Sequence, residues 1–403
     1  MPEAVIVATA RSPIGRANKG SLVDVRPDDL AATIVRAALD KLPDLDPSTV
    51  EDVIIGCAQP AGEQGYNLGR VVAILAELGD VPGTTVNRYC SSSLQTIRMA
   101  AHAIGMNEGD VFVAAGVECV SRFDKGRSDG NPGTVNERFA DARARTKARS
   151  DGSGGDWAPQ SGLPDVYIAM GQTAENVAEY ESVTREEMDE FAARSQNRAV
   201  DSQTNGFFER EITPVTLPDG TVMSKDDGPR PDTTVEKLAQ LKPVFRPDGT
   251  VTAGNACPLN DGAAAVVVMS DTRANELGIQ PLARIVSSGV SALNPEIMGL
   301  GPIEASRQAL GRAKLTIDDM DLVEINEAFA AQVLPSAKHL GIRMEKLNVH
   351  GGAIALGHPF GMTGARIMTT LLNGLEDAGG RYGLETMCVG GGQGMAMVVE
   401  RLA

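Results

Sequence analysis

The chain has 403 residues, of which 42% are hydrophobic and 22% are charged, so it is long enough for two or three domains with substantial cores. Its formal net charge of −16 argues against nucleic acid or an anionic membrane surface as the main partner, because phosphate binding requires an excess of Lys and Arg. Five widely spaced cysteines without a CxxC pair indicate neither a disulfide framework nor a metal site. Together with the absence of an apolar run long enough for a signal peptide or a membrane span, they lead us to expect a cytoplasmic protein.

The N-terminal part of the chain alternates predicted strands and helices. The apolar run at 4–10 predicts a buried strand. Residues 28–42 predict an amphipathic helix, which we expect to be capped by Asp28 or Asp29. Residues 50–60 predict a second strand. This alternation is typical of an α/β protein.

Cys90 lies between a short β-like run and an amphipathic helix. Leu94, Ile97 and Ile104 recur after it at helical spacing, which places the thiol at or near a helix N-terminus. Unpaired N–H groups and the helix dipole are expected to lower the pKa of a thiol there and so prepare a nucleophile. The alternative is that Cys90 is a small buried hydrophobe, which is the commoner role of a lone cysteine.

The pattern of the first part of the chain recurs in its last third. Strand-like, helical and glycine-rich segments follow one another in the same order in both parts, which indicates an internal duplication. We therefore predict an N-terminal half at 1–120 that is completed by 252–275, and a C-terminal half at 276–403. Two such halves predict stacked layers of helices and sheet.

Residues 121–251 break this pattern with clusters of Gly, Asp, Pro and Arg. We interpret them as an inserted, loop-rich lobe. Within it, Thr184 and Glu187 form a capping-box signature at the start of a long helix. Because long loops in compact domains are usually functional, we expect this lobe to cover a ligand.

Two glycine-rich turns carry further reactive side chains, namely His358 in GHPFG and Cys388 before GGGQG. The chain has no phosphate-binding loop motif, and the GGGQG run precedes a strand-like segment, which argues against a dinucleotide site. Equivalent turns of two pseudo-symmetric halves can meet at the shared axis, so we expect these groups and Cys90 at one site. A neighbouring imidazole can take the proton of a thiol, and a second thiol can shuttle protons during acyl transfer.

The chain resembles the thiolase family over essentially its full length. The resemblance rests on five motifs in order: VNRYCSSSLQ, VTAGNACPLNDGAAA, EINEAFA, GGAIALGHPFGMTGAR and MCVGGGQG. It implies an α/β fold of duplicated βαβ halves, layered α-β-α-β-α, with an inserted loop domain. It also implies a coenzyme A-dependent acyltransferase that cleaves 3-ketoacyl-CoA to acetyl-CoA and a shortened acyl-CoA, or runs the condensation in reverse.

The resemblance also implies roles for individual residues. Cys90 would be the acyl-accepting nucleophile, His358 its activator and Cys388 the acid and base. Asn326 would hold a water that forms one oxyanion hole together with His358, and the backbone N–H groups of Cys90 and Gly390 would form the other. No metal and no permanently bound cofactor is implied. The inserted lobe and its neighbours would bind CoA as a substrate through Met170, Arg230, Phe245, Cys257, Ala328 and Phe329.

Three functions remain open at this point: a degradative 3-ketoacyl-CoA thiolase, a biosynthetic acetoacetyl-CoA thiolase, and a non-catalytic acyl-CoA or lipid-binding relative. The third is disfavoured because all reactive side chains are present. Ser93, Ala169 and the Gly-rich segment 150–163 suggest a reshaped acyl pocket. We therefore expect medium, branched or ring-bearing substrates to be preferred over acetoacetyl-CoA. The resemblance further implies a homodimer or a homotetramer.

Other residues have structural alternatives. Cys57 and Cys119 lie in apolar strand-like runs and are expected to be core thiols. We interpret His350, which precedes a glycine pair, as structural support. Trp157 is either a packing anchor or part of an acyl tunnel, and the sequence leaves both open.

Overall fold

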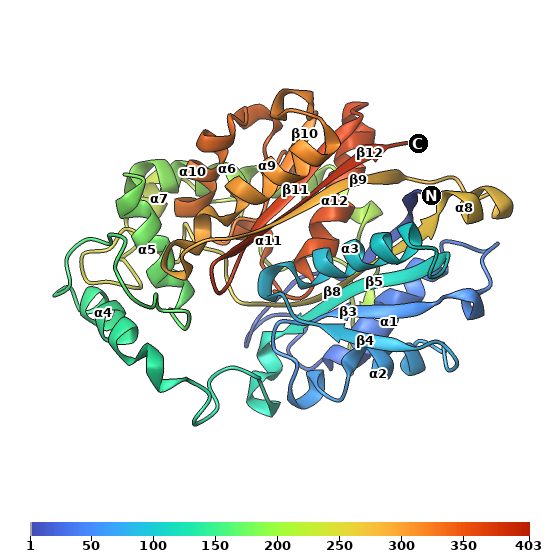
Figure 1. The fold of residues 1–403 in the computed structure, drawn as a ribbon, viewed down its shortest axis with the longest axis horizontal. Coiled ribbons are helices and arrows are strands. Elements are labelled where there is room, and N and C mark those ends of the chain that lie inside the picture. Colours follow the sequence, from blue (N-terminus) through green and yellow to red (C-terminus); the bar gives the residue numbers. More distant parts are fainter. Residues whose placement is uncertain (1) are drawn as a thin grey trace.

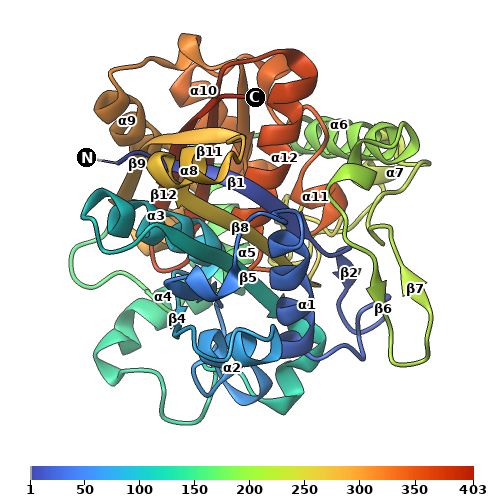
Figure 2. The ribbon, with the colours of Figure 1, turned by 90° about the vertical axis from the view of Figure 1, so that its right-hand side faces the viewer.

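A mixed sheet of ten strands runs through the molecule, which we describe from a computed structural model of residues 2–403 (Figure 1). A separate two-stranded hairpin, formed by β6 (Val215–Thr216) and β7 (Val222–Met223), lies at the edge seen in Figure 2. The strands of the large sheet follow the spatial order β10 (Leu322–Ile325), β11 (Tyr382–Val389), β12 (Gln393–Arg401), β9 (Ala283–Ala292), β1 (Ala4–Arg11), β8 (Asn260–Ser270), β5 (Val111–Cys119), β3 (Asp52–Gly56) and β4 (Gly83–Val86), with β2 (Gly15–Arg16) beside β8.

The strand order mirrors itself about the centre of the sheet. The first and last strands of one half, β1 and β8, are antiparallel neighbours, and so are β9 and β12 in the other half. Farther out, each half contains a parallel pair, which is β3 with β4 in the first half and β11 with β10 in the second. The outermost position, β4 in one half, is represented in the other by a single parallel bridge between Val323 and Leu347. The two halves join where Val5 and Ile6 of β1 pair with β9, so the sheet is continuous across the repeat.

Two helices pack between the two halves of the sheet, and further helices cover the outer face of each half, which gives five layers (Figures 1 and 2). Three buried apolar clusters lie between the layers, and their burial drives the layers to pack together. This confirms the predicted layered α-β-α-β-α fold. The helices are α1 (Pro27–Leu39) and α2 (Leu68–Leu75) on one outer face, α3 (Ser92–Gly105) and α12 (Thr363–Ala378) in the middle, and α9 (Gly301–Ala313) and α10 (Ala330–Leu340) on the other outer face.

The two central helices approach each other closely at their N-termini. A side chain at Gly364 would collide with the backbone of Leu94, so only glycine allows this approach. The backbone N–H of Ala365 donates a hydrogen bond of 2.9 Å to Ser93 Oγ. The turns that precede α3 and α12 are thereby brought together.

The start of α1 differs from the prediction. The helix begins at Pro27 after Arg26, and no side chain caps it. Proline suits the first helical position, because its missing N–H is one that has no intrahelical partner there. Asp28 instead accepts hydrogen bonds from the guanidinium of Arg26, at 2.7 and 3.0 Å. The expected capping by Asp28 or Asp29 is therefore wrong.

The segment between β5 and β8 combines helices with long loops and lies to one side of the sheet (Figure 1). The capping box at Thr184 and Glu187 is confirmed, with Thr184 N–H 2.8 Å from the Glu187 carboxylate. Within residues 2–403, no helix combines the length and apolar character that a membrane span requires. The remaining helices are α4 (Ala140–Ser150), α5 (Met170–Tyr180), α6 (Arg185–Thr204), α7 (Val235–Ala239), α8 (Asp271–Leu277) and α11 (Ala353–Leu356).

Candidate active site

Cys90 lies in a tight turn, Tyr89–Ser91, directly before α3. Tyr89 has a φ of 42°, a left-handed conformation that costs a bulky L-residue energy and persists only where neighbours enforce it. Its N–H donates a hydrogen bond of 2.8 Å to Asn87 Oδ1, and the guanidinium of Arg88 donates one of 2.8 Å to Gln393 Oε1 in β12. The turn that presents Cys90 is thus held from both halves of the chain.

The thiol of Cys90 is almost fully buried, with 7% of its surface exposed. Burial raises the pKa of the thiol to about 11, although hydrogen bonds from the backbone N–H groups of Gly390 and Cys90 itself act in the opposite direction. The expectation that the helix N-terminus would lower this pKa is therefore wrong, because desolvation outweighs the N–H groups. The resting thiol is neutral and needs a base.

Alkylation of Cys90 by iodoacetamide should reflect this neutral thiol. With a pKa of about 11 the thiolate fraction increases roughly tenfold per pH unit below that value, so we expect the rate to rise steadily from pH 7 to pH 10. The rate would be measured by mass spectrometry of the Cys90 peptide, with Cys90→Ala as the control. A rate that reaches its plateau below pH 8 would show an ion pair in the resting state and contradict the assignment.

His358 is a buried, neutral imidazole whose tautomer follows from its partners. Burial, and to a smaller extent the charge of Arg366, lowers the pKa of His358 to about 3. Its Nδ1 lies 2.6 Å from the hydroxyl oxygen of Thr363, and that hydroxyl donates its proton to the carbonyl of Pro359 at 2.9 Å. The hydroxyl oxygen must therefore accept a hydrogen bond from Nδ1–H. This leaves Nε2 unprotonated and able to accept a proton.

Asn326 stands next to that free nitrogen. Its Nδ2 lies 3.3 Å from His358 Nε2, while its backbone carbonyl accepts a hydrogen bond of 2.6 Å from Gln332. Asn326 Oδ1 is buried and has no hydrogen-bond partner among residues 2–403. Buried polar atoms are nearly always paired, so this oxygen is available for a donor that enters the site.

Cys388 is the penultimate residue of β11 and is completely buried. Burial first, and then the nearby sulfur atoms of Cys90 and Cys257, raise the pKa of Cys388 well above that of a free thiol. Gly391 and Gly392 follow with φ of 76° and 79°, which lets the chain turn sharply into β12. The structure therefore gathers three thiols, two of which were predicted as reactive groups.

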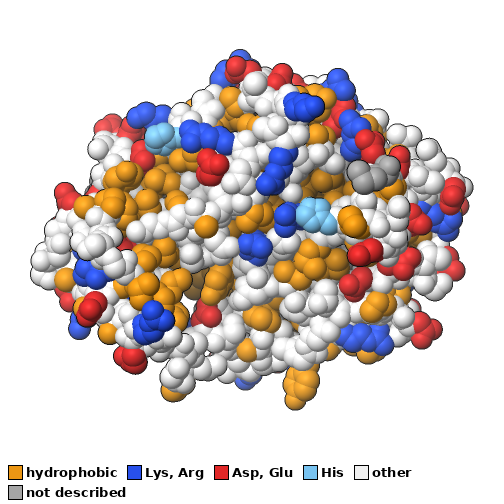
Figure 3. Space-filling model, viewed as in Figure 1, with side chains coloured by type: hydrophobic (Ala, Val, Ile, Leu, Met, Phe, Trp, Pro, Cys, Tyr) orange, Lys and Arg blue, Asp and Glu red, His pale blue; other side chains and the backbone are white. Residues whose placement is uncertain are grey.

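Two cavities flank these groups. The first, of about 410 Å³, is lined by Cys90, Gly390 and Met170 among others. The second, of about 460 Å³, is lined by Arg230, Phe245 and Cys257, and by several residues of the segment predicted as an inserted lobe. Figure 3 shows apolar side chains gathered on the side of the face near α4 and α5. These cavities are large enough for parts of a small-molecule ligand.

Two residues predicted to contact CoA lie behind the second cavity instead of lining it. Ala328 and Phe329 are buried, with 4% and 7% of their surfaces exposed. The carbonyl of Ala328 accepts a hydrogen bond of 3.0 Å from the N–H of Cys257, and the ring of Phe329 packs edge-on against Phe245. Both therefore support lining residues, because strand-like pairing at Ala256 and Phe329 turns them inward.

Sequence analysis missed Glu118, which is the penultimate residue of β5 and is completely buried. Its carboxylate accepts hydrogen bonds from the N–H groups of Ala58 at 2.8 Å and Gly361 at 3.0 Å, and from the amide of Gln64 at 2.9 Å. Burial raises the pKa of Glu118 to about 7, although these hydrogen bonds act to lower it. Glu118 thereby ties the turn after His358 to the end of β3. An acidic residue inside an apolar strand was the signal, since such groups are buried only when partnered.

Arg16 is a second residue that was missed. It lines the second cavity together with Arg230. Burial and then the charge of Arg16 lower the pKa of Arg230, and no carboxylate counters them in the described part of the chain. No local sequence pattern could have identified Arg16, because β2 meets residues 228–230 only in the folded chain.

Ser93 does not line the cavity beside Cys90, contrary to the expectation that it reshapes an acyl pocket. It is fully buried, and its hydroxyl accepts the N–H of Ala365 between the two central helices. The segment 150–163 also lies outside the lining, whereas Ala169 belongs to it. The hydroxyl of Ser93 is buried between the two central helices and is therefore not available to a ligand.

The remaining structural interpretations can be compared with the contacts. Cys57 and Cys119 are fully buried, as expected for core thiols. His350 stacks on the ring of Phe207 with ring centroids 3.5 Å apart, which is a packing role. Trp157 is buried against Tyr180 and donates a hydrogen bond from its indole nitrogen, so it is an anchor and does not line either cavity.

Comparison with known proteins places this site in a family. The family described as Thiolase, N-terminal domain matches residues 4–272, and Thiolase, C-terminal domain matches residues 279–401. A beta-ketoadipyl-CoA thiolase of Acinetobacter baylyi is 45% identical over 413 residues, and a 3-ketoacyl-CoA thiolase of Pseudoalteromonas translucida is 43% identical over 411 residues, each covering 100% of both chains.

A solved structure agrees with these matches. The crystal structure of the Bacillus anthracis acetyl-CoA acetyltransferase superimposes with a TM-score of 0.86 at 40% sequence identity, and the match covers 100% of this chain and 99% of the other. The family match extends over both halves and over the turns that carry Cys90, His358 and Cys388. The chain therefore belongs to the thiolase family and is an acyltransferase enzyme.

Proposed function

We propose that this enzyme cleaves 3-ketoacyl-CoA by thiolysis, giving acetyl-CoA and an acyl-CoA two carbons shorter, through an acyl group on Cys90. The observation that carries the proposal is the pairing of a neutral thiol at a cavity with a neutral imidazole. Cys90 opens to the first cavity, and the tautomer of His358 leaves Nε2 free to accept a proton. The two groups suit nucleophilic acyl transfer.

In the first half of the reaction, His358 takes the thiol proton and the Cys90 sulfur attacks the 3-keto carbon. The bond between carbons 2 and 3 then breaks, and its electron pair leaves as the enolate of acetyl-CoA. Cys388 protonates that carbon, so acetyl-CoA departs and the acyl group stays on Cys90. The neutral, buried thiol of Cys388 is suited to donate this proton. Asn326 and His358 would stabilise the enolate oxygen with the help of a water.

In the second half, the thiol of free CoA gives its proton to Cys388 and attacks the thioester carbonyl on Cys90. The backbone N–H groups of Cys90 and Gly390, which point at the sulfur in the resting site, would stabilise the oxyanion of this tetrahedral intermediate. The intermediate collapses to the shortened acyl-CoA, and the Cys90 sulfur recovers its proton from His358. Thiol, imidazole and second thiol return to their starting protonation states.

Product analysis tests this function directly. Purified enzyme incubated with 3-oxohexanoyl-CoA and CoA should give equal amounts of acetyl-CoA and butanoyl-CoA, measured by liquid chromatography and mass spectrometry. No product from this or longer 3-oxoacyl thioesters, combined with acetoacetyl-CoA formation from acetyl-CoA, would favour the biosynthetic alternative. No turnover in either direction would favour the non-catalytic binding protein.

We also propose that the second cavity binds CoA, with 121–251 as the covering lobe and with Arg16 and Arg230 near the anionic groups. The charge of Arg16 lowers the pKa of Arg230, and an anion bound between the two guanidinium groups would relieve this repulsion. Phe245 and Cys257 line the same cavity, and Met170 lines the neighbouring one beside Cys90. The substrates thus enter as acyl-CoA and CoA.

Replacing Arg230 by glutamine should raise the KM for CoA about tenfold to hundredfold at low salt, because a charge-assisted contact to phosphate contributes about 1.5–3 kcal/mol. The kcat should change little, since Arg230 does not line the cavity that contains Cys90. Arg343→Gln, at an exposed position outside both cavities, serves as the charge-matched control. Steady-state kinetics between 20 and 300 mM salt measure both effects. An unchanged KM would remove Arg230 from the CoA site.

A homodimer or homotetramer is the proposed assembly. Strand β4 ends the sheet and pairs only with β3, so its outer N–H and C=O groups face outward. Tyr66 beside it is 97% exposed, and Ile74 and Leu75 of α2 are also exposed. Open strand edges and exposed apolar side chains favour a self-complementary contact.

The five free cysteines fit the reducing cytoplasm, which we propose as the location of this enzyme.

Light scattering at micromolar concentration should give a mass of at least two chains. Thr85→Pro, placed on the β4 edge, should weaken the assembly, because proline cannot donate a strand hydrogen bond. Asp44→Pro, at an exposed position in a turn outside β4, serves as the control. A fully active monomer of the unmodified chain would refute the assembly.

A further inference from the structure

The cavity beside Cys90 has a lining that bears on the acyl group of the substrate. Apart from the thiol and its glycine neighbours, the lining is mainly apolar and aromatic. Among residues 2–403, the only charged side chain that lines it is Asp129, and no Lys, Arg or His does. The principal lining side chains are Tyr89, Val135, Val166, Tyr167, Ile168 and Phe360.

Asp129 is held at the rim of this cavity by a buried amide. Gln59 Nε2 donates a hydrogen bond of 2.7 Å to Asp129 Oδ2, and Gln59 Oε1 accepts the N–H of Asp129 at 2.8 Å. The N–H of Gln59 in turn donates to Glu118 at 3.2 Å. Burial first, and then the negative charge of Asp129, raise the pKa of Tyr89 beside the nucleophile. The negative charge of Asp129 is therefore felt at Tyr89 inside the cavity, although the Asp129 side chain is exposed to solvent.

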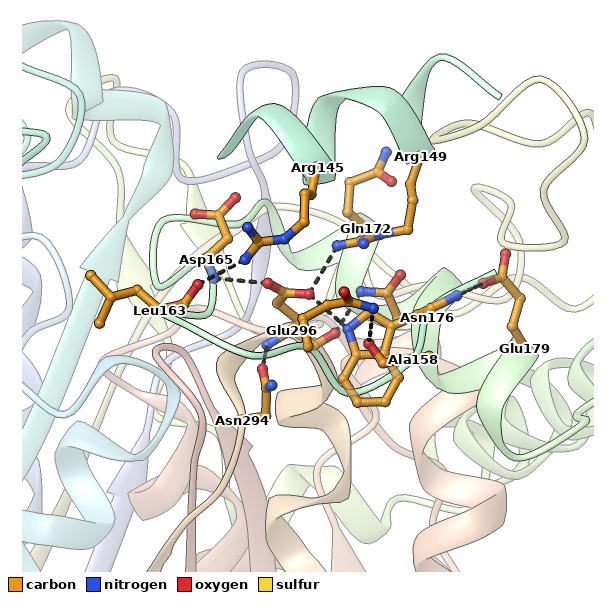
Figure 4. A network of polar contacts seen from close by, with 12 residues as sticks. Arg145, Arg149, Ala158, Leu163, Asp165, Gln172, Asn176, Glu179, Asn294 and Glu296 are labelled. Carbon is orange, nitrogen blue, oxygen red and sulfur yellow. Dashed lines mark hydrogen bonds and ion pairs between the residues drawn. The ribbon is translucent and has the colours of Figure 1, made fainter. Parts of the chain in front are cut away.

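The part of the cavity wall at residues 166–168 is fixed by the polar network drawn in Figure 4. The carboxylate of Glu296 accepts hydrogen bonds from the N–H of Asp165 at 2.9 Å, the guanidinium of Arg149 at 2.9 Å and the indole of Trp157 at 2.7 Å. Asp165 then accepts the N–H of Tyr167 at 3.0 Å. A buried carboxylate with three donors holds the wall at 166–168 in one position.

Arg127 is a cation that lies close to this rim. Its guanidinium packs near Gly130, which lines the cavity, but Arg127 itself does not line it. Its side chain is exposed to solvent, which screens its charge. A carboxylate at the end of an acyl chain would therefore lie among apolar groups and near Asp129, with no cation in the lining.

We infer that the acyl chain of the substrate is uncharged and mainly apolar, and that Asp129 disfavours a chain that ends in a carboxylate. This inference rests on the proposed thiolysis. Moving a carboxylate from water into a cavity without a partner cation is costly, and a second negative charge at the rim adds repulsion. Relatives named beta-ketoadipyl-CoA thiolase would differ from this enzyme in that respect, since an adipyl chain ends in a carboxylate.

The test compares two thioesters of the same chain length, 3-oxohexanoyl-CoA and 3-oxoadipyl-CoA, which differ in a terminal methyl or carboxylate. We expect kcat/KM to favour 3-oxohexanoyl-CoA at least about tenfold, because that ratio measures differential transition-state binding. Asp129→Asn should raise kcat/KM for 3-oxoadipyl-CoA about threefold to tenfold and leave the other within about twofold. The gain is limited, and should shrink at 0.5 M salt, because Asp129 is exposed.

Two variants serve as controls. Asp44→Asn makes the same charge change at an exposed position outside the cavity and should change neither substrate. Arg127→Gln should also leave the preference unchanged. A wild-type preference for 3-oxoadipyl-CoA that Arg127→Gln abolishes would overturn the inference and assign Arg127 to the carboxylate. Equal turnover of both thioesters would overturn this inference alone, whereas turnover of neither would overturn the proposed thiolysis.

Discussion

Replacing Cys90 by alanine is expected to lower both thiolysis and condensation at least about 10,000-fold, because the acyl group then has no sulfur to which it can bond. The fold and CoA binding should persist, since the thiol is small and the second cavity, where we propose that CoA binds, is lined by other residues. Rates would be measured in both directions, and CoA affinity by calorimetry. Cys119→Ala, which removes another fully buried thiol outside both cavities, is the matched control and should stay active.

The same experiment includes a covalent test. Wild-type enzyme incubated with acyl-CoA in the absence of free CoA should carry one acyl group on Cys90, visible by mass spectrometry of the digested protein. If the enzyme turned over with no adduct on Cys90, the assignment of the nucleophile would be wrong. An adduct on Cys257 instead would point to the third thiol of the cluster, which lies near Cys90 and Cys388.

Replacing Cys388 by alanine should divide the reaction differently. The variant keeps the Cys90 sulfur and His358, so acylation of Cys90 should still occur. Proton transfer to the enolate and from CoA is lost, and general acid–base catalysis contributes about 100- to 10,000-fold, so steady-state turnover should fall by that factor. Rapid-quench kinetics would measure the acyl-enzyme burst and the slow phase separately.

Cys388→Ser provides the companion variant, because serine preserves the volume and a weak proton donor. A partial recovery of turnover relative to Cys388→Ala would support a proton-transfer role. Loss of Cys90 acylation to the same extent in the Cys90 and Cys388 variants would contradict the division of roles. Because Cys388 lies in the buried part of β11, circular dichroism must show that both variants remain folded.

Local patterns in the sequence determined a large part of this protein. The order of strands and helices in each half followed from hydrophobic periodicity, and the capping box at Thr184 followed from side-chain chemistry three residues apart. The placement of Cys90 directly before α3 followed from the same spacing. Such features depend on neighbours in the chain, so a single sequence contains them. The ordered motifs were sufficient to identify the family that the comparisons then confirmed.

Only the tertiary structure decided the electrostatics and the contacts of the site. The pKa of Cys90 depends on how much water the folded chain excludes, and burial reversed the direction expected from its helix position. Ser93 proved to contact α12, and Ala328 lies behind the second cavity, because each meets a segment far away in sequence. Glu118 gathers donors from three separate segments. Desolvation and long-range hydrogen bonds arise when distant segments pack, and no local pattern encodes them.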